Sequence, residues 1–401
     1  MKVNISSVIE KPITGEWGED GGNIKILRTT NFTNEGRIKF DEVVTRNIEA
    51  GKVALKKLKR GDIIIEKSGG SPNQPVGRVV FFDENETYLC NNFTSILRPV
   101  TNKIHPKYLH YILFCNHKFG VTNSFQNKTT GIINLKLQRY IDEIQIPLPP
   151  LSIQKKIADI LDAADLYRQK TKTLIEKYNQ LAQSLFLEMF GGLKGEKCTL
   201  DLCCELNPKK SEISHLERTT IVSFVPMASV SEKGELQLED NRELCDVWNG
   251  FTFFKENDVV FAKITPCMEN GKGAIMKNLK NGIGFGTTEF HVLRPIEKVS
   301  SPTWLYYLTT NEKFRKEAEK NMTGSAGQKR VPIDFFRKYQ VICPPITLQT
   351  QFADRIQLIE AQKQQAQSSL KKAETLFNSL LQKAFKGGFG EDFSNKAIFL
   401  A

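Results

Sequence analysis

Three short stretches of the sequence hold residue types that could bind a metal ion, a nucleotide or a target base. A metal-dependent nuclease needs an Asp and then Asp/Glu-x-Lys, so that two carboxylates hold the ion, but Asp62 with Glu66-Lys67 lacks the spacer residue. Gly271-Lys272-Gly273 lacks the first glycine and the hydroxyl residue of a phosphate-binding loop. Asn207-Pro208-Lys209-Lys210 lacks the aromatic side chain with which amino-methyltransferases stack on a base. We therefore expect no catalytic residue in the chain.

The eight cysteines and five histidines show no metal-ligand spacing. Cys203 and Cys204 are adjacent and Cys198 lies five residues earlier, but no CxxC pair occurs and no histidine follows at zinc-ligand spacing. We expect neither a metal ion nor a cofactor. Unpaired cysteines in a long chain indicate a reducing compartment, and the sequence has no apolar signal core and no run of about 18 apolar residues. We therefore expect a cytoplasmic protein with no membrane contact.

The charge balance favours a polyanionic partner. The net charge is +11 and the isoelectric point is about 9.1, which favours nucleic acid over a membrane surface, although charge alone leaves a merely basic protein open. With 401 residues and 40% hydrophobic residues, the chain is expected to fold into two or three domains.

The sequence contains a long internal repeat. Leu97-Arg98-Pro99 recurs 196 positions later as Leu293-Arg294-Pro295, and residues 149–154 (Pro-Pro-Leu-Ser-Ile-Gln) recur 195 positions later at 344–349 (Pro-Pro-Ile-Thr-Leu-Gln). Solenoid repeats have periods of roughly 20–50 residues. The repeat therefore predicts a duplicated pair of domains.

The first part of each repeat is typical of a mixed α/β domain. Short apolar runs such as Ile63-Ile64-Ile65 and Val259-Val260-Phe261 predict strands, and they are separated by turn-forming residues. Nucleic-acid phosphates and base edges are bound by Lys, Arg, Gln and hydroxyl side chains on loops. The candidate contact residues on such loops are Lys67, Ser68, Lys128, Thr129, Lys263, Thr265, Gln328, Lys329 and Arg330. The alternative for each of them is a solvated charge or a turn former.

The second part of each repeat predicts a long helix. Apolar residues alternate steps of four and three from Ile157 to Met189 and again from Phe352 to Ala384, and both series carry a basic residue at the same place, Arg168 and Lys363. Pro-Pro precedes each helix, Ser152 and Thr347 are expected to be the N-caps, and Gly191-Gly192 and Gly387-Gly388 end the helices. About 39 residues span ~58 Å, which exceeds the width of a small domain. We expect the two helices to pair antiparallel.

The apolar series from Ile157 to Met189 forms a seam along the first helix, and a second apolar stripe lies beside it. Its members are seven residues apart, and most of their equivalents in the second helix are polar. They are Ile160, Tyr167, Leu174 and Leu181. We favour packing of this flanking stripe on an α/β domain, and contact with another subunit is the alternative.

The sequence resembles the specificity subunits of Type I restriction–modification systems over nearly its whole length. The most specific segment is residues 147–158, in which PLPPL-x-x-Q-x-x-I leads into the first long helix. Residues 343–349 resemble the family's distal conserved region, and residues 26–32 and 61–65 resemble framework segments of its target-recognition domains. Asn257 in place of Gly61 and Phe352-Ala353 in place of the usual Ile-Ala are departures.

The resemblance implies an α/β fold class with two similar mixed α/β target-recognition domains separated by two long antiparallel helices, in a pseudo-two-fold internal repeat. The expected segments are a first target-recognition domain (1–150), a central helix (151–192), a second target-recognition domain (193–345), a distal helix (346–390) and a tail (391–401). Each domain would read one half of a gapped, asymmetric site in double-stranded DNA. Partners would be two modification (methyltransferase) subunits and the restriction (motor-nuclease) subunits, which would carry S-adenosylmethionine and ATP.

Three other functions remain open at this stage. The first is a recognition or scaffold protein of another DNA-modification system. The second is a coiled-coil scaffold without DNA affinity, which predicts no salt-dependent binding to DNA. An enzyme is the third, and it would turn over substrate without partner subunits.

Overall fold

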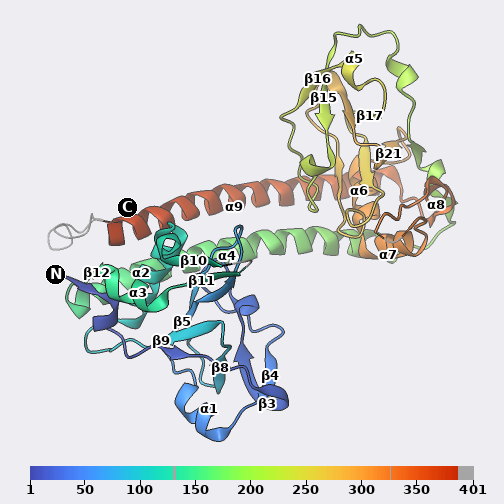
Figure 1. Cartoon of the computed structure of the whole chain (residues 1–401). Coiled ribbons are helices and arrows are strands. Elements are labelled where there is room, and N and C mark those ends of the chain that lie inside the picture. The colour runs from blue at the N-terminus through green and yellow to red at the C-terminus, as the bar shows by residue number, and fades with distance from the viewer. Residues whose placement is uncertain (130–131, 326, 387–401) are drawn as a thin grey trace. The chain divides into compact units, whose positions relative to one another are not determined.

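The structure is a computed structural model and describes residues 1–129, 132–325 and 327–386. The chain divides into two compact units, of which the first contains Met1–Lys170 and the chain from Ser369 onward, and the second contains Thr171–Ser368. Each unit holds one α/β domain together with part of helix α4 (Leu151–Phe190) and part of helix α9 (Ile346–Lys386) (Figure 1).

The first α/β domain consists of small sheets and three helices. The sheets have the strand orders β2-β9-β5-β7, β4-β3-β8, β10-β11-β6 and β1-β12. The strands are β1 (Lys2–Asn4), β2 (Ile13–Thr14), β3 (Glu19–Leu27), β4 (Val44–Asn47), β5 (Ile63–Glu66), β6 (Ser68–Gly70), β7 (Val79–Phe81), β8 (Tyr88–Cys90), β9 (Thr94–Leu97), β10 (Gln126–Thr129), β11 (Ile132–Leu135) and β12 (Gln145–Pro147). The helices are α1 (Ala50–Lys56), α2 (Pro106–Lys118) and α3 (Leu137–Glu143).

The second α/β domain has the sheet orders β14-β21-β18-β19, β16-β15-β20-β17 and β13-β22. The strands are β13 (Cys198–Thr199), β14 (Cys204–Leu206), β15 (Ile221–Val225), β16 (Asn241–Glu243), β17 (Thr252–Lys255), β18 (Val259–Ala262), β19 (Gly273–Ile275), β20 (Ile283–Gly286), β21 (Phe290–Pro295) and β22 (Gln340–Val341). The helices are α5 (Leu244–Val247), α6 (Pro302–Thr310), α7 (Glu312–Lys320) and α8 (Ile333–Lys338).

The central sheets of the two domains have the same strand order, and their central strand pairs have the same register. In the first domain β5 pairs antiparallel with β9, with Ile63 opposite Leu97. In the second domain β18 pairs antiparallel with β21, with Val259 opposite Leu293, which are the same positions shifted by 196. The apolar runs β5 and β18 are buried along their whole length, as expected of strands covered on both faces. The duplication seen in the sequence is therefore a duplication of structure.

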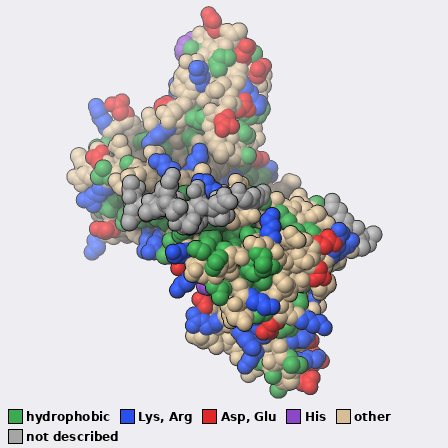
Figure 2. All heavy atoms as spheres, turned by 90° about the vertical axis from the view of Figure 1, so that its left-hand side faces the viewer, with side chains coloured by type: hydrophobic (Ala, Val, Ile, Leu, Met, Phe, Trp, Pro, Cys, Tyr) green, Lys and Arg blue, Asp and Glu red, His purple; other side chains and the backbone are tan. Residues whose placement is uncertain are grey.

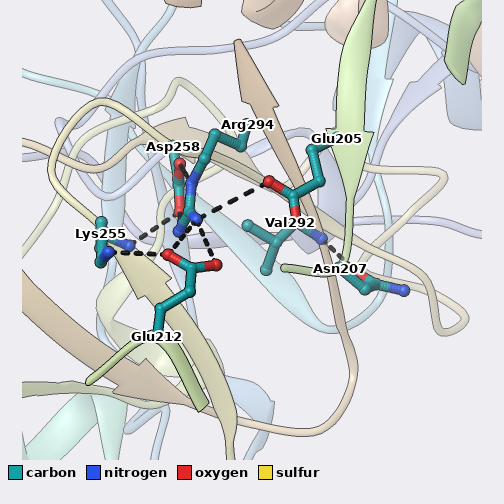
Figure 3. A network of polar contacts seen from close by, with 7 residues as sticks. All are labelled: Glu205, Asn207, Glu212, Lys255, Asp258, Val292 and Arg294. Carbon is teal, nitrogen blue, oxygen red and sulfur yellow. Dashed lines mark hydrogen bonds and ion pairs between the residues drawn. The ribbon is translucent and has the colours of Figure 1, made fainter. Parts of the chain in front are cut away.

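An aspartate–arginine pair holds the same corner of each central sheet. The Arg98 guanidinium donates to both carboxylate oxygens of Asp62, at 2.8 and 2.7 Å, and Arg294 does the same to Asp258, at 2.8 and 2.8 Å. Figure 3 shows the second pair, where Glu212 also accepts from Arg294. Both aspartates are almost completely buried, so that each charge depends on its bidentate partner.

A buried glutamine joins each α/β domain to its long helix. Gln154 accepts from the His105 amide at 2.8 Å and donates to the carbonyls of Lys103 and Pro149. Gln349 repeats this pattern with the amide of Ser301 and the carbonyls of Val299 and Pro344. Each side chain thus satisfies backbone groups of the loop before α2 or α6 and of the Pro-Pro segment.

The two long helices form the predicted seam. In the first unit Ile157 and Leu161 of α4 share a core with Phe377 and Leu380 of α9. In the second unit Ala182 of α4 shares a core with Phe352 and Ile356 of α9. Early α4 thus packs with late α9 in one unit and late α4 with early α9 in the other, which is antiparallel pairing. The fold class expected from the sequence is confirmed.

The basic residues of the seam are buried beside acidic ones. Arg168 donates to Asp165 at 2.6 Å and its guanidinium lies 4.4 Å from the Phe377 ring centroid. At the equivalent position Lys363 pairs with Glu360 at 2.7 Å. A carboxylate three residues earlier on the same helix neutralises each buried charge.

The N-caps of the two long helices differ from expectation. The helices begin one residue before Ser152 and Thr347, so these residues are not N-caps. The carbonyls of Pro150 and Pro345 accept the first helical amide hydrogen bonds instead, because proline's fixed φ does not prevent it from preceding a helix. α4 ends before Gly191 as predicted, whereas Gly387-Gly388 lie outside the described residues.

The favoured interpretation of the flanking stripe is wrong for most of its length. Ile160 packs against the core of the first unit. Tyr167, Leu174 and Leu181 are 55%, 43% and 50% exposed, respectively. A helix of 40 residues extends beyond the surface that an α/β domain can cover, which leaves these apolar side chains at the surface.

Candidate nucleic-acid interface

In the first unit a small sheet brings the two candidate loops together. Strand β6 begins at Ser68, directly after Lys67, and pairs with β11, whose Asn134 lies opposite Ser68. Strand β10 pairs with β11 as a hairpin and contains the backbone of Lys128 and Thr129, whose side chains lie outside the described residues. Residues about 60 positions apart in the sequence thus share one sheet.

In the second unit the equivalent segments also lie side by side. Ile264 and Arg330 form a β-bridge, the Thr265 amide donates to the Lys329 carbonyl at 3.1 Å, and the Val331 amide donates to the Lys263 carbonyl at 2.9 Å. The candidates of residues 263–265 and 328–330 therefore form one surface. The sequence had placed them only on separate loops.

Lys67 and Lys263 occupy equivalent positions, 196 residues apart, at the end of β5 and β18. Both are half-buried, and burial lowers the pKa of each ammonium group below its usual value. The Lys67 ammonium donates to the Thr14 hydroxyl at 3.1 Å rather than to a carboxylate. A cation held beside a strand end without direct neutralisation is suited to receive an external anion.

Several candidate residues are held by neighbouring side chains. Arg330 donates to both oxygens of Glu289, at 2.9 and 2.8 Å, and this arginine holds the pKa of the Glu289 carboxyl below its usual value. Thr265 donates to Glu269 at 2.7 Å and Ser68 donates to Asn134 at 2.5 Å. These three side chains shape the surface, whereas Gln328 and Lys329 are exposed at its rim.

A shallow pocket of about 260 Å³ opens next to Lys263. Asn207, Lys210, Phe251 and Thr288 line it, which adds an amide, a cation, an aromatic ring and a hydroxyl. Sequence reasoning missed these residues as a binding site because they come from three distant segments. The position of Asn207-Pro208 as the repeat of Lys11-Pro12 was the available signal.

The acidic residues considered for metal binding are structural. Asp62 is paired with Arg98, and Glu66 accepts two hydrogen bonds of 2.9 Å from Arg78. The described part of the chain holds no group of three or more His, Cys, Asp or Glu side chains that could bind a metal ion. None of its helices is long and apolar enough to cross a bilayer.

On the face that Figure 2 draws, lysine and arginine side chains are interspersed with aspartate and glutamate among the coloured residues. A net charge of +11 thus does not by itself mark an interface, and the candidate site rests on local geometry.

The fold and these sites define a protein with two related α/β domains, each with a lysine-bearing loop pair, and two antiparallel helices. The model of the Type I restriction modification DNA specificity domain matches residues 9–181 and 222–373. The chain belongs to this family.

Individual relatives agree with this assignment. The specificity subunits of the Type I restriction enzymes EcoAI and EcoEI, both from Escherichia coli, are each 40% identical to it over 191 and 194 residues, which is 46% of this chain and 32% of theirs. The matched stretch thus spans about a third of those relatives. The EcoKI specificity subunit of Escherichia coli K12 is 22% identical, covering 91% of this chain and 82% of its own.

Solved structures share the fold. A chain from a study of complex assembly in the type I R-M system superposes with a TM-score of 0.54 at 14% identity, covering 96% of this chain and 97% of that one. The S subunit of a Type I restriction-modification system from M. genitalium gives a TM-score of 0.53 at 15% identity and covers 96% of both chains.

Proposed function

We propose that the chain is the sequence-specific DNA-recognition subunit of a Type I restriction–modification complex. Each α/β domain reads one half of a gapped, asymmetric site in double-stranded DNA. The observation that carries this proposal is the pair Lys67 and Lys263, two half-buried cations at equivalent strand ends, each beside a second loop rich in polar and basic residues. Phosphate contacts from such lysines fix the register in which neighbouring loops meet base edges.

The differences between the two copies support an asymmetric site. Buried Glu66 and Arg78 of the first copy are Ala262 and Lys272 in the second, by the pairing of β5 with β7 and of β18 with β19. In the sequence, at a shift of 196, the pocket residues Asn207 and Lys210 correspond to Lys11 and Thr14. The frame is the same and the groups presented on it differ. Two α/β domains that share a fold but present different side chains would recognise two different half-sites.

Catalysis belongs to partner subunits in this proposal. Two modification subunits would methylate the DNA with S-adenosylmethionine, and restriction subunits would supply the ATP-driven motor and nuclease. The exposed residues Leu174 and Leu181 of α4 support a role for this helix in docking a partner, because an apolar stripe on a charged helix gains free energy when it is covered.

Methylome sequencing tests the proposal directly. One host expresses the modification subunit with this chain, and a second host expresses the modification subunit alone. We expect methyladenine at a single gapped motif only in the first host. Identical methylation in both hosts, or methylation by this chain alone, would overturn the proposed role.

A further inference from the structure

Three cysteine sulfurs meet where the second α/β domain joins α9. Cys203 is buried at the end of a short 3-10 turn (Leu200–Leu202), and its sulfur lies 3.6 Å from that of Cys198 on β13. Cys343 lies two residues beyond β22, and its interaction with the Cys203 thiol shifts the pKa of both groups. Cys198 and Cys343 are half-buried, so that small solutes reach the cluster from the surface.

The cluster adjoins the glutamine that attaches the domain to the helix. The Cys343 sulfur lies 3.5 Å from the Val299 carbonyl oxygen and 4.0 Å from Nε2 of Gln349. That same Nε2 donates to the Val299 carbonyl at 2.9 Å. Oxidation of Cys343 would therefore alter a sulfur atom that contacts both Val299 and Gln349, which join the α/β domain to α9.

The first unit shows that this framework does not require sulfur. Val3 on β1 lies opposite Ile146 of β12, as Cys198 lies opposite Val341. At the same shift of 195 residues, Val8 corresponds to Cys203 and Leu148 to Cys343. Both cores are complete, the first with three aliphatic side chains and the second with three thiols.

We propose that Cys198, Cys203 and Cys343 form a redox-sensitive modification site that takes a peroxide as its oxidant and closes a disulfide between Cys343 and Cys203. The Cys343 thiolate attacks one peroxide oxygen, forming a sulfenic acid and releasing hydroxide, which takes a proton to become water. The Cys203 sulfur then attacks the sulfenic sulfur, and the expelled hydroxide leaves as water with the Cys203 proton. Two thiols and one hydrogen peroxide give one disulfide and two waters.

The ionisation of the pair agrees with these roles. The interaction with Cys203 lowers the pKa of the Cys343 thiol, which favours the reactive thiolate at the accessible position. The same interaction, together with burial, raises the pKa of Cys203, so that it remains the proton-bearing partner. Burial also raises the pKa of neighbouring Cys204 to about 12, and the thiol of Cys204 donates to the Leu200 carbonyl rather than to Cys343.

Peptide mapping of the full-length chain tests the site. The protein is treated with hydrogen peroxide, the remaining thiols are blocked with N-ethylmaleimide, and tryptic peptides are analysed by mass spectrometry. Tryptic cleavage places Cys198, Cys203 and Cys204 on the peptide 198–209 and Cys343 on 339–355. We expect a reductant-sensitive link between these two peptides, while exposed Cys245 is blocked as a monomeric thiol.

The matched control copies the first unit. The triple variant Cys198→Val, Cys203→Val and Cys343→Leu should fold, give no link, and keep its melting temperature after peroxide. Because a link between positions 203 and 343 closes a long loop, oxidised wild-type protein should melt several degrees higher and revert with dithiothreitol. A bond confined to the peptide 198–209, or sulfenylation of Cys343 without any link, would overturn the proposal. The readouts do not depend on DNA, so the proposed recognition function is tested separately.

Discussion

The two half-buried lysines make the most direct prediction for a single residue. Replacing Lys67 or Lys263 with Met keeps the apolar stem and removes the charge, so affinity of the assembled methyltransferase complex for DNA should fall uniformly across sequences. The slope of log affinity against log salt should decrease by about 1 for each lysine removed. Binding titrations at several salt concentrations measure both quantities.

A suitable control is Lys277→Met. Lys277 is exposed just beyond β19, at the end that pairs with Val259, which is the end of β18 away from Lys263. The Lys277→Met variant removes one positive charge from the α/β domain that contains Lys263. An equal loss of salt dependence in this control would show that net charge, and not the position of Lys263, determines DNA affinity.

His291 predicts a pH dependence of stability. Its Nε2 donates to the Val331 carbonyl at 2.8 Å and its Nδ1 faces the Asn207 amide, which fixes the neutral ring. Burial lowers its pKa from 6.5 to about 4. The unfolded chain therefore binds a proton first, so stability present above pH 6.5 is lost as pH falls toward 4, by about 3 kcal/mol.

Urea denaturation between pH 7 and pH 4 measures this effect. The variant His291→Gln should show a weaker decline over that interval, since one titrating group is gone. His215→Gln, at an exposed position, is the control and should keep the wild-type decline. Parallel curves for wild type and His291→Gln would contradict the assignment.

At the scale of single strands, the buried ion pair of Glu66 on β5 and Arg78, directly before β7, should behave as a coupled unit. Removing Arg78 alone leaves the Glu66 carboxylate buried without its bidentate partner, which costs about 3–5 kcal/mol. In the second copy the equivalent residues are Ala262 and Lys272, because the Ala262 amide donates to the Lys272 carbonyl as the Glu66 amide donates to that of Arg78. Removing both Glu66 and Arg78 leaves no buried charge without a partner. The double variant Glu66→Ala/Arg78→Ala should therefore be less destabilised than the sum of the single variants by at least about 1 kcal/mol. Additive losses in a double-mutant cycle would refute the coupling.

The exposed stripe of α4 predicts a docking phenotype. Leu174→Lys should weaken association with the modification subunit without lowering the melting temperature, because the side chain contributes little to the fold but would be covered by a partner. Ser369→Lys introduces the same charge at the equivalent position of α9 and is the control. The measurement is the yield of modification subunit that co-purifies with each variant. Equal yields for the two variants would argue against a docking role for α4.

The elements show what a sequence can predict. The seam from Ile157 to Met189 was predictable because a heptad period is a local pattern. The ion pair between Glu66 and Arg78 could not be predicted from the sequence, because it depends on the register of β5 against β7. The pocket beside Lys263 likewise required the fold, because Asn207 and Thr288 come from separate strands and turns. Exposure of Leu174 could not be foreseen either, because it depends on how far the α/β domain covers the helix.

At the scale of the whole molecule, several buried polar contacts are the same in both copies. The bidentate pairs Asp62–Arg98 and Asp258–Arg294 and the glutamines Gln154 and Gln349 keep their partners across a shift of 195 or 196 residues. A buried charge or amide tolerates few replacements, because losing one partner leaves the other unsatisfied. We therefore expect each junction with a long helix to accept either α/β domain.

This interchangeability leads to a prediction for a duplicated reader. Residues 193–345 are replaced by residues 1–150, so that both Pro-Pro junctions follow copies of the first α/β domain. Because each domain is proposed to read its half-site through its own loops, methylome sequencing should reveal a gapped motif whose two half-sites have the same sequence, matching one half of the wild-type motif. A control chain with silent junctions at the same positions should keep the wild-type motif. An unchanged asymmetric motif in the duplicated chain would mean that the second α/β domain does not select its half-site, and recognition would then have to lie in the helices or in a partner subunit.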